Sequence, residues 1–582
     1  MRLPIVSTAF ALCAGASCQT FDYVIAGAGT CGLVLANRLT EDPNVRVAVI
    51  EPGSDERNNP NVTDPLKAFT ALDTSIDWMY ATTPQPGAAN RTLAFHAGKG
   101  IGGTSLINGM TYIRGDEAQF NAWELFGNEG WNWSALFPYY KAVENFSPPT
   151  AAQAEAGATY DPEDHGYDGP LDVGFPFALS NGTFHEKAAS AWNSLGYPEN
   201  PDVNSGNVRG FDIWPQTLNR DQNIRADAAR AYYYPVEDRP NLTVIKGTVR
   251  KMTWADRIPG EGVVVADGVE YINANNKTAT IHASKEVILS AGAVRSPLIL
   301  ERSGIGLPRF LAELGIRPIV DLPGVGEHMQ EQPLNTVIYE TSENFSSTIV
   351  PYATFATAYD LFGCETANLG ASIEAKIPRW AEQVSAASQE GALNASAIEK
   401  LFRVKHDLIF KKNVTIVETI STGSSSNLIS SLWLLLPFSW GSVHLKSAEA
   451  INDPAIDPRY FLVDFDMDVQ IALARLSREF WNTEPISAWV GEGVSTLEGN
   501  ATDEEWAQFI RETVSPNHHP IATASMMARE LGGVVDPSLK VYGTRNVRVV
   551  DASVLPMQVS GHLTATLYAV AEKAAEAIKA AS

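Results

Sequence analysis

The stretch that decides the fold lies near the start of the chain and reads Phe21-Asp22-Tyr23-Val24-Ile25-Ala26-Gly27-Ala28-Gly29-Thr30-Cys31-Gly32. Its first half is an apolar, β-rich run that predicts a strand, and its second half is a G-x-G-x-x-G turn. Residues 33–39 then have helical spacing, and residues 45–50 form a second apolar run that ends at Glu51. The order of strand, glycine turn, helix, strand and acid is typical of a βαβ unit that binds a dinucleotide.

Each part of this unit has a physical role in holding a dinucleotide. The glycines permit a tight turn and let the backbone approach a pyrophosphate closely. The start of the helix presents free N–H groups and the positive end of its dipole to the phosphate charge. Glu51 follows at close to the spacing from which an acid accepts hydrogen bonds from a ribose diol. A chance glycine loop is the alternative, and the unit alone does not distinguish NAD from FAD.

Length and composition restrict the class of protein. A chain of 582 residues is long enough for two joined domains, and its 45% hydrophobic and 19% charged residues are those of an ordinary globular protein. The formal net charge is −24. Because so acidic a surface repels phosphate backbones and anionic lipids, we expect neither nucleic acid nor a membrane as a partner.

The first residues predict export from the cell. Residues 1–18 combine a basic start, a short apolar run and small residues, which is typical of a signal peptide rather than of a membrane span. We therefore expect a secreted, extracellular and N-glycosylated protein, with association with the cell wall left open. Outside the leader, Cys31 and Cys364 are expected to be free thiols. The N-x-[ST] sequons stand at Asn61, Asn90, Asn132, Asn145, Asn181, Asn241, Asn276, Asn344, Asn394, Asn413 and Asn500.

Four later segments carry a resemblance to a known family. Residues 98–110, GKGIGGTSLINGM, resemble the first signature of the glucose-methanol-choline (GMC) oxidoreductases. Residues 292–306, GAVRSPLILERSGIG, follow an apolar run at 287–289 and resemble the second signature. Residues 517–523, NHHPIAT, are similar to the base-bearing motif, and residues 561–566, GHLTAT, follow in the family's order. The resemblance covers nearly the whole chain and is strongest to fungal glucose oxidases and FAD-dependent glucose dehydrogenases.

This resemblance implies an architecture. We expect an α/β FAD-binding domain with a Rossmann-like βαβ unit, joined to an α+β substrate domain on a largely antiparallel sheet. The FAD-binding domain is expected to be discontinuous and to comprise residues 20–60, 95–115, 235–330 and 533–582. The substrate-binding domain is expected to comprise residues 60–240 and 330–532.

The resemblance also assigns FAD contacts residue by residue. To the ADP half it assigns Gly27, Gly29, Thr30, Cys31, Gly32 and Glu51, with Val249 near the adenine. Along the pyrophosphate, the ribityl chain and the flavin it places Thr104, Asn108, Gly109, Met110, Thr111, Asp551 and Ala552. Some members attach FAD through a histidine directly before the asparagine of the first signature. That position is Ile107 here, so we expect non-covalent FAD. The spacing of His, Cys and carboxylates predicts no metal site.

The resemblance maps the catalytic pair to His519, the usual base, and to His562. An imidazole suits a base because its pKa lies near the working pH. His562 also precedes a helical pattern over 563–578, whose N-terminal dipole would stabilise an anionic reduced flavin. The implied reaction is oxidation of a small-molecule alcohol by hydride transfer to flavin N5, with O2 or another electron acceptor completing the cycle.

Departures from the family pattern bear on the substrate. Ser515 stands where glucose-oxidising relatives carry an arginine, which favours an aryl, furan or secondary-metabolite alcohol over free glucose. His518 stands where these relatives carry an aromatic residue, and Glu418 is a candidate for the pocket wall. Residues 327–332, EHMQEQ, differ from the pattern at their second and sixth places, for which the sequence offers no functional reason. A sugar oxidase or dehydrogenase, and a non-redox FAD-containing lyase or cyclase, stay open as alternatives.

Overall fold

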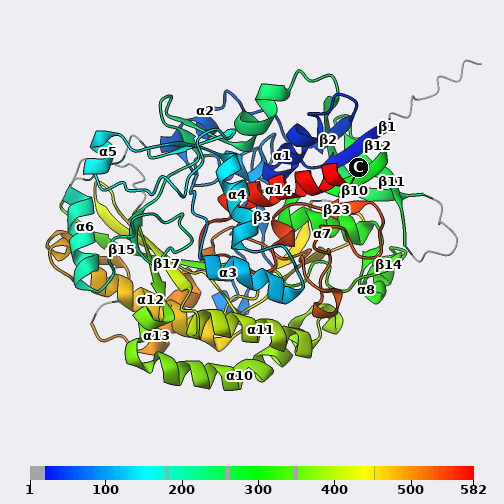
Figure 1. Ribbon diagram of the computed structural model, residues 1–582. Helices are drawn as coiled ribbons and strands as arrows, with labels where there is room; N and C mark the ends of the chain where they lie inside the picture. Colours follow the sequence, from blue (N-terminus) through cyan, green and yellow to red (C-terminus); the bar gives the residue numbers. More distant parts are fainter. Residues whose placement is uncertain are drawn as a thin grey trace, which may run out of the picture.

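A computed structural model describes the fold of the chain. It covers residues 20–176, 179, 183–255, 263–343, 345, 352–450, 452–497 and 499–581. The predicted leader and the sequons at Asn181 and Asn344 lie outside the described residues. Figure 1 shows a parallel sheet and the helix α14 (Leu563–Ala580) toward one end, and the helices α10 (Thr366–Ala387) and α11 (Ala395–Phe410) at the other.

The first sheet joins strands that lie far apart in the sequence. Its parallel strands are β1 (Thr20–Ala26), β2 (Val47–Glu51), β10 (Leu242–Trp254), β12 (Thr278–Leu289) and β23 (Val547–Val549). β1 pairs with β2 on one side and with β12 on the other, while β10 pairs with β2 and β23 with β12. The parallel order is therefore β10-β2-β1-β12-β23. The remaining halves of β10 and β12 pair in antiparallel fashion with β11 (Ala266–Asn273).

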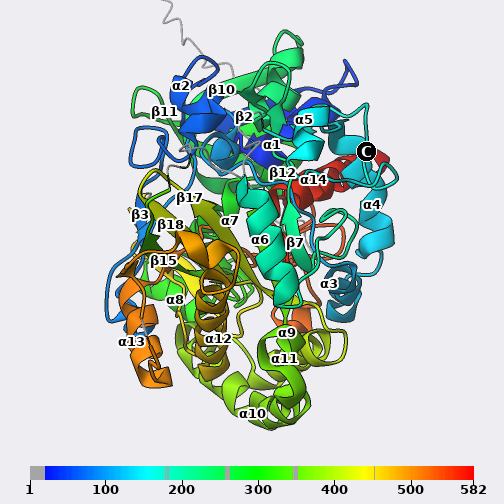
Figure 2. The same cartoon turned by 90° about the vertical axis from the view of Figure 1, so that its left-hand side faces the viewer.

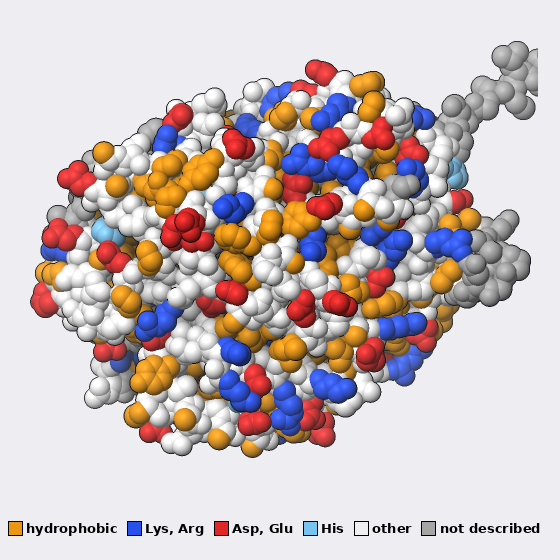
Figure 3. Space-filling model, viewed as in Figure 1, with side chains coloured by type: hydrophobic (Ala, Val, Ile, Leu, Met, Phe, Trp, Pro, Cys, Tyr) orange, Lys and Arg blue, Asp and Glu red, His pale blue; other side chains and the backbone are white. Residues whose placement is uncertain are grey.

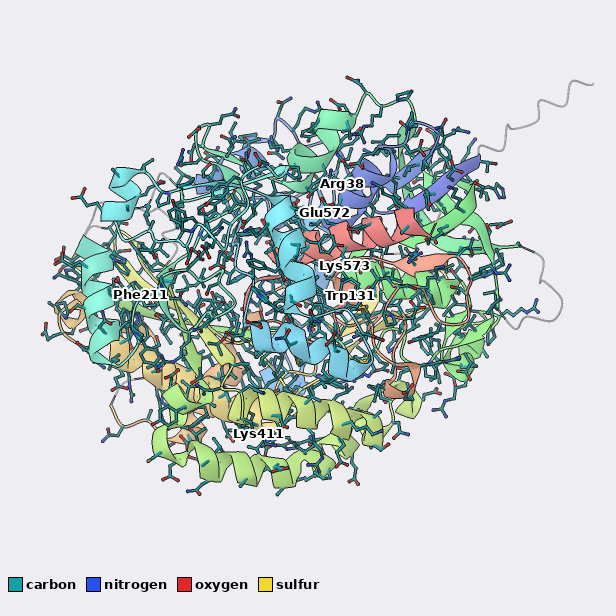
Figure 4. The ribbon with its side chains drawn as sticks, viewed as in Figure 1. Arg38, Trp131, Phe211, Lys411, Glu572 and Lys573 are labelled. Carbon is teal, nitrogen blue, oxygen red and sulfur yellow. The ribbon has the colours of Figure 1, made fainter. Side chains whose placement is uncertain are left out.

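The predicted βαβ unit is present, and its helix packs against the C-terminal helix. α1 (Thr30–Leu39) connects β1 to β2 and begins inside the glycine turn, earlier than residues 33–39 suggest. Between α1 and α14, Arg38 Nη2 lies 2.8 Å from Glu572 Oε1, and the two side chains point toward each other in Figure 4. Lys573 Nζ lies 5.0 Å from the centre of the Trp131 ring. The first of these contacts holds α14 against α1, and the second holds it against the segment before α4.

The second sheet has seven strands, of which six lie on one antiparallel path and one short strand lies at its side. Its order is β21 (Gly493–Ser495), β15 (Pro333–Glu340), β18 (Asn427–Leu434), β17 (Thr415–Gly423), β16 (Tyr352–Thr357) and β7 (Gly210–Ile213), with β22 (Ser515–Pro516) paired to β15. One face lies against α12 (Asp464–Trp481), as Figure 2 shows. From α12, Gln470 Nε2 donates to Leu432 O at 3.0 Å and Trp481 Nε1 to Ser430 Oγ at 2.9 Å.

The other elements cover these sheets. The further helices are α2 (Pro60–Thr63), α3 (Glu117–Ala122), α4 (Trp133–Val143), α5 (Ala151–Glu155), α6 (Thr183–Ser194), α7 (Gly292–Arg302), α8 (Pro308–Glu313), α9 (Ala358–Phe362) and α13 (Asp503–Thr513). The short strands are β3 (Tyr80–Ala81), β4 (Ala94–Phe95), β5 (Glu144–Ser147), β6 (Leu171–Gly174), β8 (Leu218–Asn219), β9 (Ile224–Arg225), β13 (Ile305–Gly306), β14 (Val320–Asp321), β19 (Ser442–Leu445) and β20 (Pro454–Asp457). How the residues divide between two domains stays a prediction.

Three properties of the whole chain bear on the expectations from sequence. Cys31 is buried, Cys364 is exposed, and both are free thiols as expected. Acidic and basic side chains are interspersed on the face shown in Figure 3, although the net charge is −24. Within the described residues, no helix is both long and apolar enough to cross a membrane.

Candidate active site

The glycine turn between β1 and α1 combines two kinds of glycine. Gly27 has φ +107°, and a Cβ there would lie 2.4 Å from Ser290 O, while a Cβ on Gly32 would lie 2.1 Å from Gly27 O. The protein itself therefore requires glycine at both positions. Gly29 is different, because its φ is −83° and the atom nearest to a Cβ would be Gly103 Cα at 3.9 Å. The space in front of Gly29 suits a group that approaches the backbone closely.

The start of α1 has the character of an anion site. Gly29 is the N-cap and supplies no side-chain hydrogen bond, so the N–H groups of the first turn, beginning at Thr30, keep free donors. The buried Ser290 Oγ nearby has no hydrogen-bond partner among the described residues. These free donors fit the pyrophosphate of FAD. The Cys31 side chain points elsewhere, with Sγ 3.5 Å from Leu567 O on α14, and burial raises the pKa of its thiol.

Glu51 stands at the end of β2, where the predicted ribose contact requires it. Its Oε2 accepts the Ala28 N–H at 3.1 Å and its Oε1 accepts the Gly53 N–H at 2.8 Å. Burial raises the pKa of Glu51 to about 7. Each oxygen retains a lone pair for a ribose hydroxyl. Val249 is buried on β10, further along that strand than Lys246, the residue that pairs with Glu51.

The loop of the first signature lies against the glycine turn. Gly102 N donates to Ala28 O at 2.8 Å, which joins the two loops. Thr104 is exposed, and its hydroxyl oxygen accepts the Gly98 N–H at 3.1 Å. Ile107, the position of covalent attachment in some relatives, is a buried aliphatic side chain here. An isoleucine offers no atom for a bond to FAD.

Asn108 has an orientation that its neighbours determine. Its Oδ1 accepts from Arg225 Nη1 at 2.7 Å and from the Met110 N–H at 3.1 Å. The amide nitrogen is therefore directed to the other side, where Nδ2 lies 3.3 Å from Thr564 Oγ1 at the start of α14. Arg225 was not among the residues that the sequence suggested.

Residues 110 and 111 of this loop are held by backbone contacts with residues 216 and 217. Met110 has φ +63°, and its carbonyl accepts the Thr217 N–H at 2.8 Å, while Thr111 forms a backbone bridge with Gln216. A Cβ on Gly109 would come within 3.0 Å of the Phe69 ring. The loop thus presents its other side to the glycine turn and to α14.

Asp551 holds protein groups with its carboxylate. Its oxygens accept from Gly292 N at 2.9 Å, Ser296 Oγ at 2.6 Å, Ser553 N at 2.9 Å and Ser553 Oγ at 2.5 Å. Burial raises the pKa of Asp551. These bonds join the start of α7 to the turn that begins at Ala552, whose carbonyl accepts the Ala522 N–H at 3.4 Å. Asp551, one of the residues assigned beside the flavin, therefore acts by fixing the backbone at the start of α7 and in the turn that follows Asp551.

The fold brings the two predicted catalytic histidines together. The rings of His519 and His562 are 5.2 Å apart between centres and nearly perpendicular, at 84°. His562 is the N-cap of α14, as the sequence predicts, and its N–H donates to Ile113 O at 3.1 Å. His519 lies in the loop after β22, a strand of the second sheet. His562 begins α14, which packs against α1 of the βαβ unit in the first sheet.

The surroundings of His519 favour a neutral ring. Its Nδ1 lies 2.8 Å from Gln332 Oε1, and its backbone N–H donates to Glu331 Oε1 at 3.2 Å. Burial, and then the positive charges that His562 and His518 can carry, lower the pKa of His519 well below its usual value. A neutral imidazole keeps a lone pair that can accept a proton. Gln332 occupies the sixth place of the segment for which the sequence offered no account.

His562 has a carboxylate behind it. Its Nε2 lies 3.1 Å and 3.2 Å from the two oxygens of Glu418, a fully buried residue of β17. The Trp433 ring meets the His562 ring edge to face at 5.9 Å. Because Glu418 accepts from Nε2, the other ring nitrogen, Nδ1, is the one available to a substrate. Glu418, a candidate for the pocket wall from sequence, thus contacts a predicted catalytic residue.

A second cluster adjoins the histidine pair, and the spacing of the sequence gave no reason to group it. His96 Nδ1 lies 2.6 Å from Asp77 Oδ2, and the His96 N–H donates to His518 Nδ1 at 3.2 Å. Asp73 lies close enough for the three side chains of Asp73, Asp77 and His96 to surround one ion. The oxygens of Asp77 also accept backbone N–H groups from Asp73, Met79 and Ala97. These bonds make Asp77 the centre of a turn.

The inner face of the seven-stranded sheet, defined by three rows of side chains, leads away from His562. The nearest row is Glu418, Trp433 and Leu334. The two outer rows are Ile420, Ser431 and Thr336, then Thr422, Ile429 and Ile338. All six side chains of the outer rows are half-buried, whereas the opposite face lies under α12. The two outer rows therefore form an uncharged, accessible surface, which adjoins the row that holds Glu418 beside His562.

Comparison with known proteins places these features in a family. Models described as GMC oxidoreductase match residues 21–334 and 437–571. The glucose oxidase-like protein fsoC of Humicola fuscoatra is 52% identical over 573 residues, 98% of this chain and 97% of that protein. The glucose oxidase of Penicillium chrysogenum is 36% identical over 572 residues, 96% of this chain and 92% of that protein.

Solved structures agree with this match. An FAD-dependent oxidoreductase from Chaetomium thermophilum has a TM-score of 0.88 at 31% identity, with 96% of this chain and 99% of that chain covered. A fungal aryl-alcohol oxidase has a TM-score of 0.83 at 28% identity, with 96% and 98% covered.

Proposed function

The chain belongs to the GMC oxidoreductase family and binds FAD, and from this premise we propose that it oxidises an uncharged, largely apolar alcohol such as an aryl or furan alcohol. The observation that carries the proposal is the inner face of the seven-stranded sheet. Its outer rows offer three isoleucines, two threonines and a serine, and they adjoin the row that holds Glu418 beside His562. Such a lining buries a ring or an alkyl chain and has no charged group to pair with an ionic substrate.

The two histidines divide the handling of the hydroxyl between them. His519 accepts the hydroxyl proton at Nε2, and His562 holds the same oxygen through Nδ1, so that the C–H bond is fixed in direction. FAD, when bound, supplies the acceptor for the hydride at its N5 atom. The substrate loses one proton and one hydride and becomes an aldehyde or ketone. Glu418 accepts from His562 Nε2, and its negative charge stabilises His562 when that ring donates through Nδ1 to the oxygen that loses its proton.

Ser515 supports a substrate other than free glucose. Its hydroxyl lies 3.5 Å from the backbone carbonyl of Leu334, within the pairing of β22 to β15. The guanidinium that glucose-oxidising relatives carry at this position has no counterpart in a serine side chain. A site that hydrogen-bonds a polyol loses much of its discrimination when one buried donor is removed.

Sugar oxidation is the second candidate. Relatives named glucose oxidase are 36% identical to the chain, and Thr336, Thr422 and Ser431 supply hydroxyls on the inner face. These three hydroxyls can hydrogen-bond a pyranose. Serine and threonine side chains can also lie against an apolar ring, so they do not exclude an apolar alcohol.

Anaerobic reduction of the bound flavin tests the function directly. We expect benzylic or furanic alcohols to bleach the flavin's visible absorbance faster than glucose does, and His519→Ala to slow this by about 100-fold or more. Admission of air then distinguishes O2 from another acceptor. Faster bleaching by glucose would favour the sugar oxidase, and a flavin that no alcohol bleaches would favour the non-redox lyase or cyclase.

We also propose that FAD is held without a covalent bond and that the protein is secreted. The first statement is supported by the aliphatic Ile107 at the attachment position, and the second by the leader-like residues 1–18 and the sequons.

A further inference from the structure

We propose that Gln332 is a positioning residue that determines which ring nitrogen of His519 carries the proton. This inference deepens the proposed function, since it rests on His519 as the base of the reaction. Gln332 directly precedes β15, is fully buried, and places its Oε1 2.8 Å from Nδ1 of the base. Neither the sequence nor the relatives' names assign it a role.

The orientation of the Gln332 amide follows from its far contact. Its Nε2 donates to the backbone carbonyl of Leu435 at 3.1 Å. A carbonyl oxygen only accepts, so the NH2 group must face Leu435 and Oε1 must face His519. The reversed amide would place its oxygen against the carbonyl oxygen of Leu435 in a buried site, where neither atom can donate.

The orientation of the amide in turn determines the tautomer of His519. Gln332 Oε1 lies 2.8 Å from His519 Nδ1, and it cannot donate, so Nδ1 must carry the hydrogen. Asn517 Nδ2 lies 3.0 Å from the same Oε1 and 3.0 Å from His519 Nδ1. Since Oε1 has two lone pairs, it accepts from both Asn517 Nδ2 and the Nδ1–H, and the two nitrogens do not hydrogen-bond each other in this arrangement. With the proton on Nδ1, the ring keeps its lone pair on Nε2, the atom that the proposed reaction uses.

Other contacts hold the backbone of His519 and leave the ring to Gln332 and Asn517. Glu331 Oε1 accepts the His519 N–H at 3.2 Å, and Gln558 Nε2 donates to the His519 carbonyl at 2.6 Å. Neither contact reaches the imidazole. The side chain of Gln332 is the acceptor that a donating Nδ1 requires.

An amide differs from a carboxylate in the charge that it brings. Glu418 places a negative charge behind His562, whereas Gln332 orients His519 without any charge. A carboxylate at this distance favours the protonated ring and raises its pKa, and an amide does not. His519 therefore stays neutral, and able to accept a proton, to lower pH than a carboxylate-backed histidine would.

Two substitutions separate this role from simple support of the fold. Gln332→Met keeps the volume and removes the acceptor, so we expect kcat to fall by about 100-fold with a smaller change in KM. Gln332→Glu restores an acceptor and adds a charge. We expect it to recover most of the rate at neutral pH and to move the acidic limb of kcat/KM upward by about 1 pH unit or more. If Gln332 only filled space, the buried charge would be at least as harmful as methionine and the limb would not move.

Gln470→Met is the matched control. Gln470 is equally buried, and its Nε2 donates to Leu432 O at 3.0 Å and to Asn335 Oδ1 at 3.0 Å on the far face of the same sheet. We expect it to lower the thermal midpoint about as much as Gln332→Met does and to leave kcat unchanged. An equal loss of kcat in both variants, or a normal rate in Gln332→Met, would overturn the proposal.

A measurement on the resting protein makes the test independent of any substrate. In wild-type protein labelled with 15N histidine, the pair of ring signals that disappears in His519→Ala should have the shifts of an Nδ1–H tautomer. An Nε2–H tautomer would refute the role of Gln332 even if every alcohol were oxidised. An Nδ1–H tautomer in a protein that oxidises no alcohol would uphold it and refute the proposed function.

Discussion

At the scale of single residues, the two histidines differ in the group that stands behind each ring. An amide contacts His519 and a carboxylate contacts His562, both at hydrogen-bond distance and both from the second sheet. In each case the contact uses one ring nitrogen and leaves the other for the substrate. Two imidazoles at 5.2 Å would repel each other if both were charged, and the uncharged amide behind His519 favours the neutral form of that ring.

Glu418→Gln tests the charge behind His562. Glutamine keeps the volume and one acceptor but removes the negative charge, so we expect the rate of anaerobic flavin reduction to fall by about 10- to 100-fold. FAD content should stay at the wild-type level, because Glu418 lies on β17 and not in the cofactor loops. Stopped-flow reduction at several substrate concentrations measures the rate.

Thr419→Val is the control for this substitution. Thr419 is the next residue of β17, points to the opposite face, and has a buried hydroxyl without a hydrogen-bond partner among the described residues. We expect its rate of flavin reduction to equal that of the wild type. A wild-type rate in Glu418→Gln would show that the charge is not needed.

The sequence predicts the histidines but not their partners. His519 and His562 stand in motifs that specify a residue type at a position, so a resemblance transfers them directly. Gln332 and Glu418 meet them only because β15 and β17 pair with β18 in a particular register, which no local pattern specifies. The unusual sixth place of residues 327–332 was visible in the sequence, but its reason required the distance to His519.

At the scale of elements, a buried imidazole joins three segments of the chain. His444 on β19 places Nδ1 2.6 Å from Glu301 Oε1 on α7 and Nε2 3.2 Å from Glu327 Oε1. Burial alone would lower the pKa of His444, but the charges and hydrogen bonds of Glu301 and Glu327 outweigh it and raise the pKa to about 10. The second signature helix is thereby tied to the loop that leads to β15.

His444→Gln should therefore destabilise the protein in a pH-dependent manner. Removal of the imidazolium takes a countercharge from both buried carboxylates and leaves Glu327 to Arg459, whose Nη1 lies 3.9 Å from Glu327 Oε2, so we expect a loss of about 3 kcal/mol in the free energy of unfolding. The folded pKa lies above the unfolded value of about 6.5, so the contribution of His444 is full below pH 6.5 and is lost as the pH rises toward 10. Urea unfolding of wild type and variant between about pH 6 and pH 10 should show the difference shrinking.

His282→Gln on β12 serves as the matched control for this comparison. His282 is half-exposed, and its Nδ1 lies 3.1 Å from the Asp267 carbonyl. We expect a much smaller loss of stability than for His444→Gln, because the His282 ring is partly exposed to solvent. A difference between wild type and His444→Gln that stays constant over the whole pH range would contradict the assignment.

Element boundaries show where the apolar pattern is an incomplete guide. The apolar run 287–289 is only the buried end of β12, a strand of 12 residues. Its first half pairs with β11 and is partly exposed, so polar residues such as Thr278 and Thr280 interrupt the pattern. The helix predicted over 33–39 starts at Thr30, because the glycine turn already has helical hydrogen bonding. An apolar run in the sequence therefore predicts the buried part of a strand or helix and not its full length.

At the scale of the whole molecule, the site exists only when both sheets are assembled. The first sheet with α1 and α14 supplies the FAD loops and His562, and the second sheet supplies Glu418, Gln332 and the inner face. His519 comes from a loop that leaves β22 at the side of the second sheet. The sequence indicates this assembly only through the resemblance, because contacts between residues hundreds of positions apart leave no local pattern.

The sequons that predict N-glycosylation differ in how far each asparagine is exposed in the folded molecule. Asn241 is buried, and its Nδ2 donates to Thr40 O at 3.1 Å, Asp42 O at 2.9 Å and Val45 O at 2.8 Å. The nitrogen that would carry a glycan is thus committed to three carbonyls. Asn61 and Asn132 are half-buried. The exposed sequons are Asn90, Asn145, Asn276, Asn394, Asn413 and Asn500.

We expect glycans on exposed sequons and none on Asn241 when a eukaryotic host secretes the protein. Glycopeptide mass spectrometry measures the occupancy of each site, and a glycan on Asn241 in active protein would contradict the buried position. Asn241→Gln should also lower the free energy of unfolding by about 1–3 kcal/mol, because three buried carbonyls lose their donor. Asn276→Gln, on an exposed turn between β11 and β12, should change stability only through the loss of its glycan. If the two variants were equally stable after enzymatic deglycosylation, the hydrogen bonds of Asn241 would not contribute to the free energy of unfolding.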